Sequence, residues 1–217
     1  MFPSGSDMAW PGPGDEASWS MPRLDQPQPH DEPSAHGLPA EVRSALFESR
    51  TVLLFGEITA ELAQAITAQL LALAARNQDP IRLLIHSPGG HVESGDTIHD
   101  VIRFIRPEVK VIGTGWVASA GALVFVAAKK ESRYALPNTR FLLHQPLGGV
   151  RGAAADIEIE AAQILAMRER INRIFAAATG QAYEKLARET ERNLWMTADE
   201  AREYGLVHRI IERVSDV

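Results

Sequence analysis

The chain has 217 residues and a formal net charge of −6, and its composition excludes several classes of protein. It contains no cysteine, which excludes disulfide bonds, thiolate metal ligands and a thiol nucleophile. It has no cluster of basic residues typical of nucleic-acid binding, no secretory signal pattern, and no apolar stretch near the roughly 20 residues of a membrane span. We therefore expect a cytoplasmic protein that binds neither nucleic acid nor a membrane.

The first 40 residues differ in composition from the rest. They hold eight of the 13 prolines, no Ile and no Val, and six acidic residues against one basic residue. Such a segment cannot bury enough apolar surface to offset the entropy lost on ordering. The sequence therefore predicts a disordered tail or propeptide over residues 1–40 and a single folded domain over residues 41–217.

In the first half of this domain, short β-rich runs alternate with amphipathic helices. The expected strands are 52–55, 81–85 and 109–112. Thr59 is expected to cap the helix after the first strand, and Ser94 the helix after the second, which Pro107 ends. Residues 118–128 are apolar and too few to span a membrane, so they predict a buried helix. This alternation predicts an α/β fold with a largely parallel sheet and right-handed crossovers.

The second half of the domain has fewer clear patterns. The expected elements are a strand at 141–143, a long helix at 156–178, a helix between a Thr197–Glu200 capping box and Gly205, and a closing strand at 207–211. The long helix has an apolar stripe. It consists of Ile157, Ile164, Met167, Ile171, Ile174 and Phe175.

Three segments at the ends of expected strands contain the parts of a serine hydrolase. Gly89-Gly90 can offer backbone N–H groups to an oxyanion, Ser119 lies among small residues, and His144 can act as a base. Each alone has an ordinary structural explanation, as a tight turn, a helix cap or a hydrogen-bonded histidine. Together, at the strand ends where parallel sheets bind ligands, they indicate nucleophilic catalysis.

These segments and their spacing resemble the ClpP family, the proteolytic subunit of the ATP-dependent Clp protease. The spacing is 29 residues from Gly90 to Ser119 and 25 from Ser119 to His144. The resemblance covers about residues 45–211. The motifs that carry it are Ser87-Pro88-Gly89-Gly90, Ala118-Ser119-Ala120-Gly121-Ala122, Leu136-Pro137-Asn138, His144-Gln145-Pro146-Leu147-Gly148-Gly149, Asp156-Ile157-Glu158-Ile159, Thr179-Gly180-Gln181 and Tyr204-Gly205-Leu206.

The resemblance implies a crotonase-like α/β fold of repeated β-α units with a protruding handle helix. It implies a homo-oligomer of two stacked heptameric rings around a closed chamber, a tetradecamer. An AAA+ unfoldase such as ClpX, ClpA or ClpC would feed unfolded polypeptides into that chamber. Ser119 would be the nucleophile, His144 its general base, and the N–H groups of Gly90 and Ala120 the oxyanion hole. The resemblance implies no metal and no cofactor.

The chain departs from the family at the third catalytic position. The family usually has aspartate there, and the matching residue here is Asn193. An asparagine oxygen can accept a hydrogen bond from the histidine Nδ1–H, but it brings no negative charge, so we expect a slower enzyme. Glu189 or Glu191 could take this role if the local chain is shifted. Glu191 and Arg192 match the pair that contacts the opposite ring in the family.

Three functions are consistent with these residues. The first is a serine endopeptidase that hydrolyses unfolded proteins in a double ring. The second is a low-activity or non-catalytic subunit that assembles with an active ClpP paralogue. Two departures keep it open: Asn193, and the Pro-rich acidic segment before Ala45, where the family usually has an apolar axial-loop pattern. The third is a crotonase-type enzyme acting on acyl-CoA thioesters, which needs no serine–histidine pair. The retained Ser119 and His144 favour the first.

Overall fold

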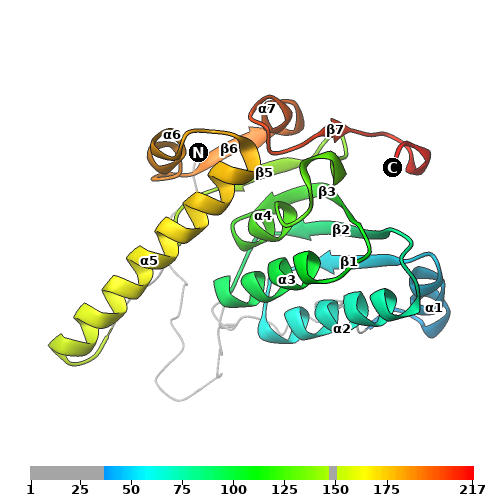
Figure 1. Ribbon diagram of the computed structural model, residues 1–217, viewed down its shortest axis with the longest axis horizontal. Coiled ribbons are helices and arrows are strands. Elements are labelled where there is room, and N and C mark those ends of the chain that lie inside the picture. The colour runs from blue at the N-terminus through cyan, green and yellow to red at the C-terminus, as the bar shows by residue number, and fades with distance from the viewer. Residues whose placement is uncertain (1–36, 147–150) are drawn as a thin grey trace, which may run out of the picture. The chain divides into compact units, whose positions relative to one another are not determined.

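The computed structural model describes residues 37–146 and 151–217 (Figure 1). The predicted tail over residues 1–40 lies almost entirely outside the described residues, as do Leu147, Gly148 and Gly149 of the motif that begins with His144. Helix α1 (Ala40–Glu48) begins directly after Pro39, which is its N-cap residue.

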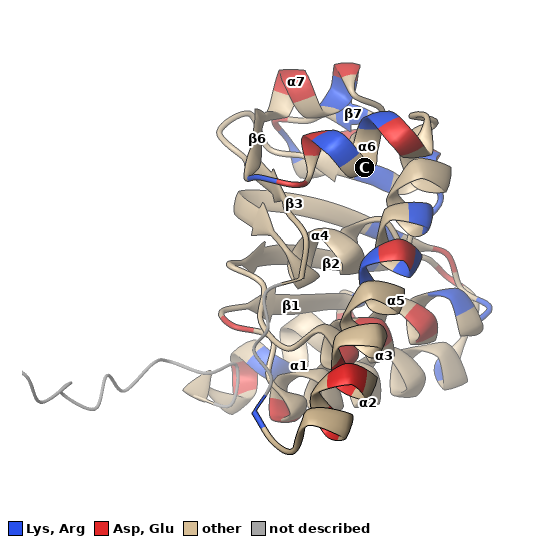
Figure 2. Cartoon of the chain, turned by 90° about the vertical axis from the view of Figure 1, so that its left-hand side faces the viewer, with Lys and Arg blue, Asp and Glu red and all other residues tan. Residues whose placement is uncertain are grey.

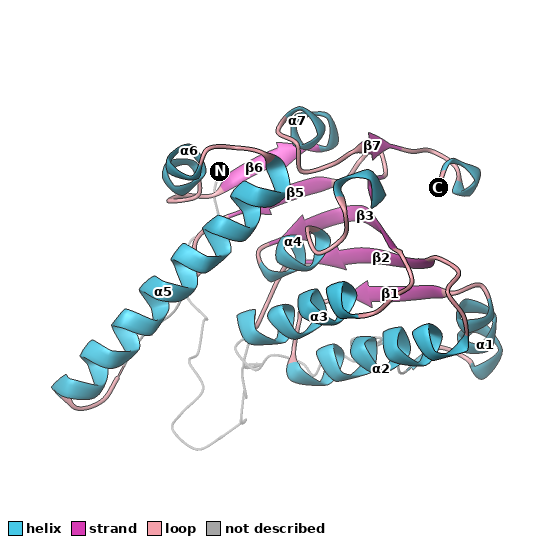
Figure 3. Ribbon diagram, viewed as in Figure 1, coloured by secondary structure: helices cyan, strands magenta, loops and turns pink. Residues whose placement is uncertain are grey.

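The strands of the described chain form one seven-stranded sheet (Figure 3). They are β1 (Thr51–Phe55), β2 (Ile81–Ser87), β3 (Val109–Ala118), β4 (Arg133–Ala135), β5 (Arg140–Leu143), β6 (Leu194–Thr197) and β7 (Arg209–Ile210). Every pair in it is parallel except β5 with β6, which is antiparallel. The predicted α/β class with a largely parallel sheet is confirmed.

Strand β3 is the branch point of the sheet. Its first half, Val111–Gly113, pairs with β4, whereas Trp116–Ala118 pair with β5. Gly115 lies between the two halves with a φ of +57°, in the left-handed region that glycine adopts without strain, and a Cβ there would collide with the His86 ring. The sheet therefore divides into one branch with β4 and β7 and another with β5 and β6.

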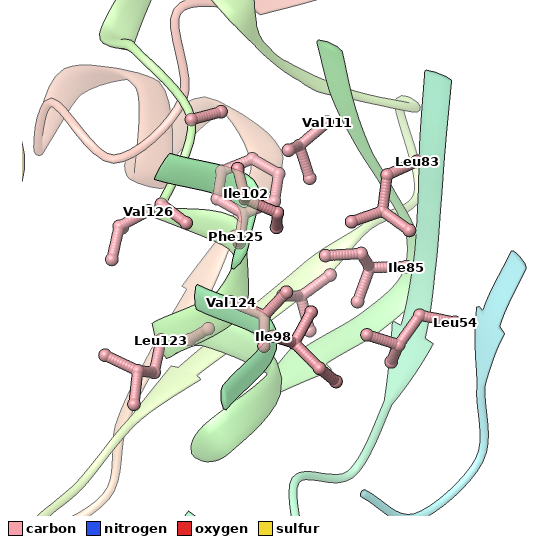
Figure 4. Close-up of a cluster of buried hydrophobic side chains, with 14 of the residues drawn as sticks. Leu54, Leu83, Ile85, Ile98, Ile102, Val111, Leu123, Val124, Phe125 and Val126 are labelled. Carbon is pink, nitrogen blue, oxygen red and sulfur yellow. The ribbon is translucent and has the colours of Figure 1, made fainter. Parts of the chain in front are cut away.

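Helices α2 (Ala60–Arg76), α3 (Val92–Phe104) and α4 (Ala120–Phe125) follow the first three strands. Figure 4 shows the core that they form with the sheet. Leu83 and Ile85 of β2 point toward Ile98 of α3, and Phe125 of α4 lies beside them. Every residue of α4 is buried, which confirms the predicted buried helix.

Two of the three predicted helix caps are confirmed. The Thr59 hydroxyl accepts a hydrogen bond from the Leu62 N–H at 3.2 Å, and the Thr197–Glu200 capping box is present. The prediction that Ser94 caps α3 is wrong. The helix already begins at Val92 with His91 as its N-cap residue, and the Ser94 hydroxyl is buried inside the helix, 2.9 Å from His91 Nδ1.

The long helix α5 (Ala154–Thr179) confirms the expectation for 156–178, but only its C-terminal half packs on the core. Ile171 and Phe175 are buried, whereas Ile157, Ile159 and Leu165 are 41%, 59% and 63% exposed. In Figure 1 the first turns of α5 extend beyond the other helices. The first half of α5 therefore presents apolar side chains that the described part of the chain does not cover.

Other elements were not expected or are shorter than expected. Helix α6 (Tyr183–Glu189), α1, β4 and β6 have no counterpart among the expected elements, and the closing strand shrinks to β7. Helix α7 (Ala198–Glu203) follows the capping box. Figure 2 shows acidic and basic residues mixed over α6, whereas in α5 the acidic residues Asp156, Glu158 and Glu160 precede the first basic residue, Arg168. Among the helices in the described ranges, none is long and apolar enough to cross a membrane.

Candidate active site

Ser119 occupies the turn between β3 and α4. Its φ of +54° and ψ of −122° are rare for a residue with a side chain and are a strained conformation typical of functional sites. Its N–H donates to the Leu142 carbonyl of β5 at 2.9 Å, which holds the strained turn in place. The serine thus lies on a sharp turn between a strand and a helix, an arrangement that is also found in the nucleophile turns of α/β hydrolases.

The glycine pair lies directly against this serine. Gly89 has a φ of +102°, and a Cβ built on it would lie 2.5 Å from Ser119 Cβ and 3.1 Å from its Oγ. Only glycine allows the loop after β2 to approach the serine this closely. Gly95 does the same for the next residue, since a Cβ there would lie 3.1 Å from Ala120 Cβ. Sequence reasoning noted the glycine pair but missed this role of Gly89 and Gly95.

Two backbone N–H groups beside Ser119 are available to an oxyanion. Gly90 forms a parallel bridge with Ile58, in which Ile58 N donates to Gly89 O and His91 N donates to Ile58 O, both at 2.8 Å. In a parallel bridge of this kind the N–H of Gly90 itself points away from Ile58. Ala120 is the first residue of α4, so its N–H has no acceptor within the helix. Neither group donates to a protein acceptor in the described ranges.

His144 follows directly after β5 and lines the same small cavity as Ser119. The cavity has a volume of about 20 Å³. Its other lining residues are Val92, Ala120, Leu123, Leu143, Pro146, Ile171 and Phe175. No hydrogen bond joins Ser119 Oγ to the His144 ring among the described residues, although the two side chains share this cavity. Such hydrogen bonds are often long without substrate and tighten when substrate binds.

Asn193 is brought to His144 by the pairing of β5 with β6. The antiparallel register runs from Arg140 opposite Thr197 to Leu143 opposite Leu194, so the next pair in this register is His144 opposite Asn193. Gln145 holds the two segments together just beyond, since its N–H donates to Thr190 O at 3.0 Å and its Nε2 donates to Glu191 O at 3.1 Å. The Asn193 side chain is exposed and makes no hydrogen bond to a described residue.

The alternative acidic residues lie close by in the chain but are placed differently. The Glu189 carboxylate accepts a hydrogen bond from the Tyr204 hydroxyl at 2.7 Å, and burial together with this bond raises the pKa of Tyr204. The Glu189 carboxylate is therefore engaged by Tyr204 and, at 4.0 Å, by Lys185. Glu191 and Arg192 are exposed on the turn that leads to Asn193.

One ion pair joins the helices on either side of the cavity. Arg170 of α5 donates two hydrogen bonds to the Asp96 carboxylate of α3, at 2.7 and 2.6 Å. These bonds raise the pKa of Arg170. The pair fixes α5, which supplies Ile171 and Phe175 to the cavity, relative to the helix that begins next to Gly90. The sequence gives no local signal for it, because the two residues are 74 positions apart.

In the part of the chain that the structure describes, no three His, Asp or Glu side chains gather as metal ligands would. The candidate site consists of backbone amides, a hydroxyl, an imidazole and an amide side chain. Chemically, this set can carry out nucleophilic attack on a carbonyl with proton transfer to the imidazole.

Comparison with known proteins gives consistent matches over most of the chain. The family model described as Clp protease matches residues 36–214. ATP-dependent Clp protease proteolytic subunit 3 of Rhizobium meliloti is 59% identical over 177 residues, which cover 82% of this chain and 91% of the relative. Proteolytic subunit 2 of Gluconobacter oxydans is 58% identical over 180 residues, covering 82% and 81%.

Solved structures agree with these matches. ClpP1 from Listeria monocytogenes superimposes with a TM-score of 0.73 at 52% identity, over 81% of this chain and 98% of that one. An asparagine-to-aspartate mutant of the same protein gives a TM-score of 0.75 at 53% identity, over 80% and 98%. The expected ClpP fold is thereby confirmed, and the alternative of a low-activity or non-catalytic subunit is not favoured. On the family model, the relatives and the shared fold, the chain belongs to the Clp protease family and is a Clp-type serine peptidase.

Proposed function

We propose that the chain is the proteolytic subunit of an ATP-dependent protease, in which Ser119 is the nucleophile and His144 its general base. The observation that carries this assignment is the shared cavity. It joins the strained Ser119 turn, His144 and the first N–H of α4 in one place.

The reaction follows from these positions. Ser119 Oγ attacks the carbonyl carbon of the scissile peptide bond while its proton passes to His144. The oxyanion of the tetrahedral intermediate accepts hydrogen bonds from the N–H groups of Gly90 and Ala120. His144 then gives its proton to the leaving amine, and an acyl-enzyme remains on Ser119. A water molecule, deprotonated by His144, releases the second product by the same route.

In this proposal Asn193 orients His144 by accepting a hydrogen bond from its Nδ1–H through the side-chain oxygen. It adds no negative charge beside the imidazolium that forms during the reaction. The acylation step is therefore slower than it would be with a carboxylate, and the residue acts through geometry alone.

The cavity also supports a preference for apolar side chains next to the scissile bond. Its walls include Leu123, Ile171 and Phe175, which are all buried. The Asp96–Arg170 pair joins α5 to α3 beside this cavity.

The proposal includes assembly and partners. The exposed apolar residues on the first half of α5, namely Ile157, Ile159 and Leu165, support contact between subunits in two stacked heptamers, with Glu191 and Arg192 at the contact between rings. The relatives are named proteolytic subunits of an ATP-dependent protease, which supports a separate ATP-using partner, and we propose that this partner is an AAA+ unfoldase that delivers unfolded polypeptides. Several relatives are numbered subunits, which supports assembly with a paralogue. We propose residues 41–217 as the peptidase domain and 1–40 as a separate tail.

A fluorophosphonate probe tests the catalytic assignment directly. We expect one probe to attach per chain, located at Ser119 by peptide mapping, and no attachment to the Ser119→Ala variant. Light scattering on the same samples gives the size of the assembly that reacts. Absence of labelling in assemblies of ring size, or labelling at another serine, would overturn the assignment.

A further inference from the structure

Three large side chains form a cluster on the sheet, and they come from the same three strands as the proposed catalytic residues. We call Trp116, Arg140 and Trp195 the aromatic clamp. Trp116 is on β3, which leads to Ser119. Arg140 is on β5, which leads to His144, and Trp195 is on β6, which follows Asn193.

The contacts within the aromatic clamp bridge all three strands. The rings of Trp116 and Trp195 are stacked, with centroids 6.2 Å apart and planes 10° apart. The Arg140 guanidinium carbon lies 4.5 Å from the centroid of the Trp195 ring. Trp116 is paired with Arg140 across β3 and β5. The stack therefore passes over β5 and joins β6 to the centre of the sheet.

Alternation along β5 and β6, continued one residue beyond each strand, places Arg140 and Trp195 of the clamp on the same face as His144 and Asn193. Arg140 and His144 are four residues apart on β5 and its extension, and Trp195 and Asn193 are two apart. An even spacing keeps both pairs on one face of a pleated sheet. The opposite face carries Phe141 and Met196, which are buried in the core.

Asn193 needs support of this kind for two reasons. Strand β6 has four residues and, among the described strands, pairs only with β5, so the sheet holds it weakly on its own. Asn193 is also neutral, so no charge attraction draws it toward His144. Its orientation must come from the position of the backbone at the start of β6.

We propose that the aromatic clamp is a positioning device, which holds the start of β6 so that Asn193 faces His144. This rests on the catalytic roles proposed above. Stacked aromatic pairs and cation–π contacts at partly exposed sites each change an equilibrium by about 3- to 10-fold. The two tryptophans are 38% and 37% exposed, which fits such a site.

The first test replaces one ring and measures catalysis in the assembled protein. Trp195→Leu is expected to lower kcat and the rate constant of fluorophosphonate labelling by about 10-fold, with KM for a fluorogenic peptide unchanged. Trp195→Phe keeps a ring over Arg140 and is expected to recover most of the rate. Phe104→Leu is the matched control, because Phe104 is 81% exposed and is the last residue of α3, outside the three strands that lead to the catalytic residues.

The second test asks whether the clamp acts through Asn193. Labelling rates are measured for Trp195→Leu, Asn193→Ala and the double variant. If the clamp positions Asn193, Trp195→Leu adds no further loss once Asn193 is alanine. Three results would overturn the inference. The first is a labelling rate in the double variant that is lower than in Asn193→Ala by the full factor seen for Trp195→Leu alone. The others are a changed KM with an unchanged kcat, and a loss of rate that light scattering explains by smaller assemblies. Normal labelling of the unmodified protein at Ser119 would leave the proposed function standing in every such case.

Discussion

Replacing Asn193 by aspartate tests how this site stabilises the imidazolium that forms on His144. The two residues are the next pair beyond the β5–β6 ladder, so a carboxylate at position 193 would face the imidazole ring. Two unit charges about 4 Å apart interact by about 4 kcal/mol at an effective dielectric constant of 20, and by about 1 kcal/mol in water. Asn193 is exposed, so the lower part of this range applies. We expect about 1–2 kcal/mol of transition-state stabilisation.

This free energy corresponds to a rise of about 5- to 30-fold in kcat, since 1.36 kcal/mol is a factor of ten. The assay is hydrolysis of a fluorogenic peptide together with fluorophosphonate labelling of Ser119, on assemblies of equal size. The gain should fall as the salt concentration rises, because the carboxylate is open to solvent. Asn77→Asp is the matched control. It adds the same charge in the turn after α2, where Asn77 Oδ1 accepts from the Asp79 N–H, and should leave the rate unchanged.

An equal or lower rate for Asn193→Asp, with the assembly intact, would refute this reasoning. It would mean that the residue at position 193 does not face His144 in the reacting state, or that another group already supplies the charge. A gain that is independent of salt would contradict the electrostatic explanation, because screening must weaken an exposed pair.

Three further outcomes are expected. Gly89→Ala should abolish labelling of the nucleophile, because the new Cβ would lie 2.5 Å from Ser119 Cβ, whereas Gly37→Ala, which meets no atom within 4 Å, should label normally. Phe125→Ala should lower the free energy of unfolding by about 3–5 kcal/mol in denaturant titrations, because the ring is fully buried against Phe141. Hydrogen bonds from Thr197 lower the pKa of Glu200, so its stabilisation is present above pH 4.5 and lost as pH falls through the lowered value. In a plot of melting temperature against pH, Glu200→Gln should therefore have a shallower slope on the acid side. An unchanged slope would contradict this.

The elements that the sequence predicted well are those with long, regular patterns. Helices α2 and α5 have apolar residues at helical spacing over many turns, and β1 and β2 end at glycine or proline. Strands β4 and β6 have three and four residues, which is too short for an alternating pattern to appear. The predicted start of α3 is wrong because the helix begins at Val92 without a capping hydroxyl, so the serine at 94 is no guide to its first residue.

The candidate site was predictable in its residue types but not in its arrangement. Ser119 and His144 could be recognised from their neighbours in the chain. Their closeness depends on β3 pairing with β5, and that of Asn193 on β5 pairing with β6, across 49 residues from His144. Long-range pairings of this kind leave no local pattern. The same holds for the stacking of Trp116 on Trp195, which unites two segments 79 residues apart.

The branch in β3 explains how one sheet brings these residues together. Had β3 continued beside β4 along its whole length, β5 would have no place next to Ser119, and the bond from Ser119 N to Leu142 O would be lost. The branch occurs at Gly115, whose positive φ changes the direction of β3. Only glycine fits there, because a side chain would collide with the His86 ring. The backbone pairings therefore fix the order Ser119, His144 and Asn193 across three adjacent strands. Side-chain hydrogen bonds between them are absent from the described residues, so substitutions such as Asn193→Asp should change the rate of catalysis without changing the fold.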